Sequence, residues 1–189
     1  LHDLDVTVAA QGMSIVRYAD DFVILCRSAE EAERALDVIR VWVAAAGLEL
    51  HPDKTRVGDC RIVGQGFDFL GYRFEAGQRR VRDKSLKALK DKIRSRTRRT
   101  EGKSLRQVIA TLNPTLRGWF NYFKHAHHDV FGWIDGFIRR RLRALLRKQA
   151  HRPGSGRCQA DHQRWPNAFF AAEGLLTMTE ARRQASQPR

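Results

Sequence analysis

Residues 13–26 read MSIVRYADDFVILC, two apolar runs separated by a short polar break. The runs at 14–18 and 22–26 are rich in β-branched and aromatic residues, and this composition predicts two antiparallel strands joined by a hairpin turn. Asp20 and Asp21 then lie together at the tip, where two adjacent carboxylates repel each other and a divalent cation relieves the repulsion. The pair predicts either a magnesium site or an ordinary solvated turn, and the two acids alone do not distinguish these.

A helix is predicted directly after this hairpin. Ser28 and Glu31 have the spacing of a capping box at a helix start, and Gly47 is suited to the helix end. Apolar residues recur between them at helical spacing, and they are Ala32, Leu36, Ile39 and Val43. One face of the helix is therefore expected to pack on the hairpin.

Short strands are expected from residue 48 to residue 82. The sequence FDFLGYRF at 67–74 predicts a strong aromatic strand, and a turn at 75–78 is expected to lead into a further hairpin strand. The other expected strands are 48–51, 55–58, 61–63 and 79–82. Together these elements predict a small antiparallel sheet with one packed helix.

Helical patterns replace the strands from about residue 83. Asp83 or Ser85 can cap a first helix. A second is expected at 104–112, and Asn113-Pro114 has the pattern of the N-cap and first position of a third. A longer helix at 130–149 and a short helical piece near 166–174 follow, separated by a loop at 152–157. The tail at 179–189 is polar and is expected to be disordered.

Charge divides the chain at nearly the same place. Residues 1–76 contain 8 Lys/Arg and 13 Asp/Glu, a net charge of −5, whereas residues 77–189 contain 27 Lys/Arg and 8 Asp/Glu, a net charge of +19. An excess of this size favours a polyanionic partner, bound with release of counterions. The alternative is a solvated basic surface without a specific partner.

Composition indicates the kind of compartment in which the chain works. The three cysteines, Cys26, Cys60 and Cys158, form no C-x-x-C pair and fit a reducing, cytoplasmic compartment better than a disulfide framework. No run approaches the roughly 20 apolar residues of a membrane helix, and the N-terminus has no signal-peptide pattern. The first residue is Leu, not Met, from which we expect that an N-terminal part of a longer chain is missing.

Five motifs in order carry a family resemblance. The sequence RYADDF at 17–22 resembles the Y-x-D-D catalytic turn of reverse transcriptases. GLELHPDKT at 47–55 resembles the block after the palm helix, and FLGY at 69–72 resembles the primer grip. LRGWFNYF at 116–123 resembles the maturase-specific region, domain X, of group II intron proteins, and RWPN at 164–167 resembles its end. From about residue 1 to 176, the chain resembles the C-terminal part of a group II intron reverse transcriptase/maturase.

The resemblance implies a fold and a domain division. The fold class is α+β: the C-terminal part of a polymerase palm, with a small antiparallel sheet and one helix, followed by an α-helical thumb bundle. The expected domains are the palm at 1–82, the thumb and maturase domain X at 83–178, and the disordered tail at 179–189.

The resemblance also implies a polymerase site. Asp20 and Asp21 correspond to catalytic, metal-binding positions for two Mg²⁺ ions, with Asp20 the main ligand. The family's third carboxylate has no counterpart here, because Asp3 and Asp5 fall where the family has a helix. We therefore expect no polymerase activity from the isolated chain. The positions implied near the primer or nucleotide are Tyr18, Ala19, Lys54, Phe69, Leu70, Gly71 and Tyr72.

The implied nucleic-acid partners are intron RNA, primer and template, with dNTP in the complete protein, and no membrane. Trp119, Phe120 and Phe123 share an apolar face with Leu116 and are expected in the core. The positions expected to contact RNA are Lys84, Lys87, Lys90, Arg94, Arg98, Arg117, Asn121, Tyr122, Arg139, Arg140, Arg143 and Arg147.

Other interpretations stay open. His125, His127 and His128, or Cys158 with His162, lack the paired spacing of a zinc site, so no zinc is expected. The chain can be an enzyme fragment that needs its other half, a stand-alone non-catalytic splicing cofactor, or a degenerate remnant. A retron-like reverse transcriptase ranks lower, because that class lacks the pattern at 116–123.

Overall fold

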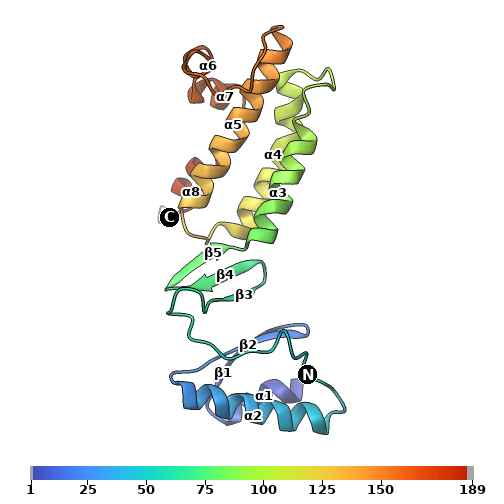
Figure 1. The fold of residues 1–189 in the computed structure, drawn as a ribbon, viewed down its shortest axis with the longest axis vertical. Helices are drawn as coiled ribbons and strands as arrows, with labels where there is room; N and C mark the ends of the chain where they lie inside the picture. Colours follow the sequence, from blue (N-terminus) through green and yellow to red (C-terminus); the bar gives the residue numbers. More distant parts are fainter. Residues whose placement is uncertain (1, 187–189) are drawn as a thin grey trace. The chain divides into compact units, whose positions relative to one another are not determined.

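The computed structural model describes residues 2–186 and divides into two compact units, one up to Gln78 and one from Arg79 onward (Figure 1). The elements of the first unit are α1 (His2–Ala10), β1 (Ser14–Tyr18), β2 (Asp21–Leu25), α2 (Ala29–Ala45), β3 (Phe67–Phe69) and β4 (Tyr72–Glu75). β5 (Gln78–Val81) begins at the boundary and completes a second sheet in the order β3-β4-β5.

The predicted acidic hairpin and its helix are confirmed. β1 and β2 pair antiparallel, from Ser14 opposite Leu25 to Tyr18 opposite Asp21. Both α1 and α2 pack on one face of this hairpin (Figure 1). The core of the unit consists of Leu4, Val8, Ile39 and Val43, with Met13, Ile15, Phe22, Ile24, Trp42 and Leu50 packed around it.

The predicted ends of α2 are also confirmed. The Ser28 hydroxyl accepts a hydrogen bond from the Glu31 backbone N–H at 3.2 Å, while the Glu31 carboxylate accepts one from the Arg27 N–H at 2.6 Å. Beyond the last turn, the Leu48 N–H donates to the Val43 carbonyl at 2.9 Å across Gly47. Local capping chemistry therefore sets both limits of this helix.

The strands predicted at 48–51, 55–58 and 61–63 are wrong, since these residues form turns and coil. Around Asp59, backbone N–H groups donate to nearby side chains and not to a neighbouring strand. The Asp59 carboxylate accepts from the Arg61 N–H at 2.9 Å, and the Gln65 side chain accepts from the Asp59 N–H at 3.1 Å. Such local bonds compete with strand pairing, and β-type composition does not supply a pairing partner.

The single aromatic strand predicted at 67–74 is also wrong, because the chain reverses in its middle. β3 and β4 pair antiparallel, with Phe69 opposite Tyr72, so Leu70 and Gly71 form a two-residue turn. Their φ values are +48° and +80°, as in a type I′ turn. Gly71 therefore supplies the left-handed backbone conformation that this turn requires.

The second unit is helical. Its helices are α3 (Asp83–Arg96), α4 (Leu105–Phe123), α5 (Asp129–Gln149), α6 (Gln159–Arg164), α7 (Asn167–Ala172) and α8 (Met178–Ala185). α3, α4 and α5 lie alongside one another (Figure 1). Their apolar faces form the core, with Leu89, Ile93, Leu112, Leu116, Phe131, Ile134, Ile138, Leu142 and Leu145 all at most 2% exposed. Burial of these apolar faces against one another stabilises the helical bundle.

Two predicted helix starts are wrong. Residues 105–123 form one helix with Pro114 inside it, not two helices meeting at Asn113. The apolar stripe continues through the proline, because Leu112 and Leu116 on either side of it are both fully buried. At α3, Arg82 occupies the N-cap without a side-chain hydrogen bond, so neither Asp83 nor Ser85 is the cap.

The disordered tail predicted at 179–189 is wrong for its first part, since α8 reaches Ala185. The buried Asp135 carboxylate of α5 accepts from the backbone N–H groups of Met178 and Thr179, at 2.9 and 3.1 Å, and from the Thr179 hydroxyl at 2.8 Å. This tertiary cap satisfies the first turn of α8, where the Thr177 side chain at the N-cap forms no capping hydrogen bond. Residues 187–189 lie outside the described part.

Candidate functional site

The acidic turn is short and solvent-facing. Tyr18 and Asp21 form the last pair of the β1–β2 ladder, so Ala19 and Asp20 alone make the turn. Ala19 has a φ of +55°, a conformation that non-glycine residues seldom adopt. Asp20 and Asp21 are exposed, and Tyr18 is 66% exposed. The turn therefore presents both carboxylates and a tyrosine ring to whatever binds there.

Arg17 fixes this turn, and the sequence analysis missed it. Its guanidinium donates to both carboxylate oxygens of Asp5 on α1, at 2.8 and 2.5 Å, and to the Ala19 carbonyl at 2.9 Å. The hydrogen bond from Arg17 holds the pKa of Asp5 below its usual range. The available signal was that Arg17 is the one charged residue of β1. Asp5 therefore lies on a helix, as expected, and orients the turn through Arg17.

The acid pair fits part of a magnesium site. Carboxylate oxygens are the ligands that Mg²⁺ prefers, and Asp20 and Asp21 form no ion pair with any described residue. Among residues 2–186, a cluster of three or more potential metal ligands forms at His127, His128 and Asp129 but not at the turn. The described chain therefore supplies two carboxylates there and gathers no third.

The residues assigned to the primer side lie on turns of the first unit. Lys54 is exposed in a turn that its N–H closes onto the His51 carbonyl at 3.1 Å. Phe69 is the last residue of β3 and Tyr72 is the first of β4, and the Leu70-Gly71 turn lies between them. Behind the tip, Phe67 and Phe74 stack with their ring centroids 5.1 Å apart. The hairpin thus has a packed base and a tight, partly exposed end.

Most cations assigned to RNA are on the surface of the second unit. Lys90 and Arg94 lie above aromatic rings of α5: the Lys90 ammonium is 5.0 Å from the Trp133 ring and the Arg94 guanidinium 5.6 Å from the Phe137 ring. Trp133, 49% exposed, stacks parallel on Phe137 at 5.8 Å. The sequence analysis missed these two rings. The exposed positions are Lys84, Lys87, Arg94, Arg98, Arg117, Asn121 and Tyr122.

The expectation of an exposed RNA-binding face is wrong for Arg143. Its side chain is 2% exposed, donates to the Trp165 carbonyl at 3.0 Å and to the Asn167 side chain at 2.9 Å, and lies over the Phe170 ring. Arg147 is largely used inside the chain too, in an ion pair of 2.7 Å with Asp161. Both arginines hold α6, α7 and the preceding loop against α5.

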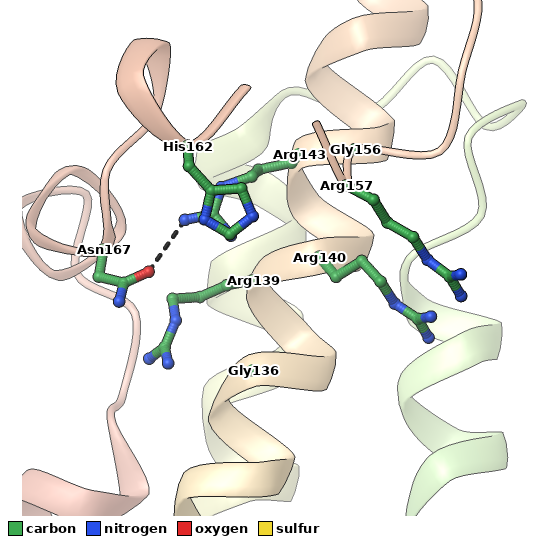
Figure 2. Close-up of a pocket in the computed structure, with 8 residues that line it drawn as sticks. All are labelled: Gly136, Arg139, Arg140, Arg143, Gly156, Arg157, His162 and Asn167. Carbon is green, nitrogen blue, oxygen red and sulfur yellow. Dashed lines mark hydrogen bonds between the residues drawn. The ribbon is translucent and has the colours of Figure 1, made fainter. Parts of the chain in front are cut away.

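Arg139 and Arg140 line a cavity beside α5. It has a volume of about 310 Å³ and is also lined by Gly136, Arg143, Gly156, Arg157, His162 and Asn167 (Figure 2). The sequence analysis placed Arg157 in a loop and His162 outside any site, and it had no signal that the fold brings them to Arg139 and Arg140.

The aromatic residues of α4 are mostly structural, as predicted. Phe120 and Phe123 are buried, and Trp119 lies 4.7 Å from the Phe123 ring. Phe120 also meets the Phe131 ring of α5 edge-on, at 5.5 Å.

Histidines gather at the start of α5. A ring nitrogen of His127 lies 3.2 Å from Asp129, and one of His128 lies 3.0 Å from the same carboxylate. Cys158, in contrast, contacts the Arg147 guanidinium at 3.4 Å. The three residues 127–129 are neighbours in sequence, which is not the spacing of a structural zinc site, and the absence of zinc stays a prediction.

A strongly basic helical unit has the charge that nucleic-acid-binding surfaces typically carry. Comparison with known families gives two matches. Residues 1–74 match the family described as reverse transcriptase (RNA-dependent DNA polymerase), and residues 86–165 match the group II intron maturase-specific domain. The chain therefore belongs to the group II intron reverse transcriptases/maturases, of which it represents a C-terminal part.

No curated protein sequence matches the chain at the significance level applied. Among the described helices, none combines the length and the apolar character that crossing a membrane requires.

Proposed function

We propose that the second unit binds intron RNA through the basic surface of α3 and α5 and that this binding assists splicing. The observation that carries the proposal is the net charge of +19 on residues 77–189, which contain 27 Lys/Arg and only 8 Asp/Glu. Structured RNA is recognised largely through phosphates, 2′-hydroxyls and shape, which suits a dense cationic surface.

The proposed RNA-facing cations are those that the fold leaves accessible. They exclude Arg143, whose hydrogen bonds point into the chain. Lys90 and Arg94 lie over aromatic rings, an arrangement that reduces the freedom of long side chains before a ligand arrives. Asn121 and Tyr122 on α4 are further proposed contacts.

In the complete protein, Asp20 and Asp21 would be ligands of Mg²⁺, with Asp20 the main one. When bound, the metal ions would activate the primer hydroxyl and stabilise the leaving pyrophosphate. Arg17 would keep the turn in place through its bonds to Asp5 and the Ala19 carbonyl. Leu70 and Gly71, between Phe69 and Tyr72, would support the primer end, while Tyr18, Ala19 and Lys54 would lie near primer or nucleotide.

RNA binding is tested by fluorescence anisotropy with a group II intron domain at several salt concentrations. We expect the logarithm of the affinity to fall steeply with the logarithm of salt concentration, because phosphate contacts release counterions. An unrelated protein of similar net charge is the control for non-specific attraction. An affinity that does not change with salt would refute the proposal.

The second candidate is a non-catalytic splicing cofactor. It is favoured by the acid turn, around which the described residues gather no third carboxylate. Primer extension with Mg²⁺ and dNTP tests this second candidate, with Asp20→Asn as the matched control. We expect no extension by the chain alone, and extension that Asp20→Asn abolishes would contradict this. The three free thiols fit the proposed cytoplasmic location of either activity.

A further inference from the structure

A second basic cavity adjoins the one in Figure 2. It has a volume of about 210 Å³ and is lined by Thr97, Arg99, Arg140, Arg141, Ser155 and Arg157, with Ala144. Arg140 and Arg157 line both cavities. In Figure 2 their two guanidinium groups extend in the same direction, Arg140 from α5 and Arg157 from the loop after it.

The loop that carries Arg157 is tied to the bundle. The Arg147 guanidinium donates to the Pro153 carbonyl at 2.9 Å, and Arg99 donates to the Gly154 carbonyl at 3.4 Å. Gly156 is buried and lies so close to α5 that an added Cβ would be 2.7 Å from the Ala144 nitrogen and 2.9 Å from the Arg140 carbonyl. This close approach holds Arg157 beside Arg140.

Carboxylates do not neutralise these arginines. Within residues 2–186, Arg139, Arg140 and Arg157 form no ion pair, and the neighbouring Asp161 is paired with Arg147. The like charges disfavour one another: burial lowers the pKa of Arg141, and the nearby Arg94, Arg140 and Arg99 lower it further. An anion in the cavities would relieve this repulsion.

We propose that consecutive backbone phosphates of one RNA strand occupy the two cavities, with Arg140 and Arg157 between them and in contact with both. This rests on the proposed RNA binding and assigns it a place. The guanidinium fork suits phosphate oxygens, and Arg140 lies over the Phe137 ring at 5.3 Å, which orders it in advance. Two adjoining cavities with shared arginines fit a repeating anion better than a single small one.

The test measures binding of a fluorescein-labelled single-stranded RNA of about 12 nucleotides to the full chain and to Arg140→Gln, Arg157→Gln and the double variant. Each single change should weaken binding several-fold and lower the slope of log affinity against log salt by about 1. Arg152→Gln is the matched control, since Arg152 is exposed in the same loop but lines neither cavity, and it should change affinity less than twofold.

Modified RNA identifies the phosphates. Replacing the backbone phosphates that occupy the cavities with neutral methylphosphonates should weaken binding of the RNA to the native chain. The same replacement should not change its binding to the double variant. RNA with a 5′-phosphate and RNA with a 5′-hydroxyl should bind alike. If the arginine variants lost affinity only for the 5′-phosphorylated RNA, the cavities would bind a terminal phosphate, and the assignment to backbone phosphates would be wrong.

Gly156→Ala provides a second variant that keeps every charge. It should weaken RNA binding several-fold because the loop must move away from α5, while circular dichroism reports whether the bundle stays folded. If the native chain binds RNA and the arginine variants bind equally well, this inference fails and the proposed function stands. If the native chain binds neither this RNA nor the intron domain, both fail.

Discussion

The acidic hairpin and the basic bundle place their charged side chains in opposite ways. At the hairpin, Asp20 and Asp21 are exposed without an ion pair to any described residue, and one arginine, Arg17, orients the turn. In the bundle, arginines of one helix differ in exposure although they line one cavity: Arg143 is buried, whereas Arg139 and Arg140 are half-buried. A turn thus exposes its side chains by its local geometry, while the exposure of a helix face depends on what packs against it.

The largest expected effect tests how strongly the bundle depends on its core. Phe131→Ala should lower the free energy of unfolding by about 3–5 kcal/mol, because it leaves a cavity at a fully buried ring. Trp133→Ala, on the same helix but at a 49% exposed position, should cost about 1 kcal/mol or less. Denaturant unfolding followed by circular dichroism measures both, and equal losses would contradict this account of α5.

The next effect separates a structural arginine from a ligand-binding one. Arg143→Gln should cost about 2–3 kcal/mol of stability, because the buried Trp165 carbonyl and the Asn167 side chain lose their donors. Arg139→Gln should change stability by about 0.5 kcal/mol or less and weaken RNA binding instead. Thermal unfolding and RNA titration of both variants give the comparison, which breaks down if the two variants behave alike.

Two glycines extend the comparison to both units. Gly71→Ala should destabilise the hairpin by about 1–2 kcal/mol, because its φ of +80° strains a residue with a Cβ. Gly118→Ala, in α4 with open space around the added Cβ, should stabilise the chain by about 0.5–1 kcal/mol. Denaturant midpoints measure the two shifts, and shifts of the same sign would rule out this explanation.

The smallest effect is a titration in the first unit. Hydrogen bonds from Arg61 lower the pKa of Asp59 to about 2, below the value of about 3.9 in an unfolded chain. The loop should therefore keep the contribution of this carboxylate above pH 4 and lose it as the pH falls through about 2. The Arg61 amide resonance should follow that transition.

Arg61→Gln is the control for the titration. It should move the Asp59 midpoint up toward about 3.9, observed at the remaining amide that the carboxylate binds. An unchanged midpoint would show that another group lowers this pKa.

Much of the chain was predictable because local signals agreed with the fold. The hairpin around Asp20, the capped helix after it and the apolar faces of the bundle all appear where their patterns lie. The predictions failed where local and tertiary preferences diverge. Pro114 suggested a helix start, but burial of the continuous apolar stripe favours one helix. The polar tail suggested disorder, but the buried Asp135 of α5 accepts hydrogen bonds from the backbone at the start of α8.

Sequence by itself determined the acidic hairpin, the opposite net charges of the two parts of the chain and the motifs of the family. Tertiary structure alone decided which arginines lie inside, where the chain reverses at Leu70-Gly71, and that Arg157 joins Arg140 at two cavities. The physical reason is range. Turn chemistry and helical periodicity act between residues close in sequence, whereas an arginine side chain is long enough to bind a carbonyl inside the fold or a phosphate outside it, and the packing of distant segments decides which of the two it meets.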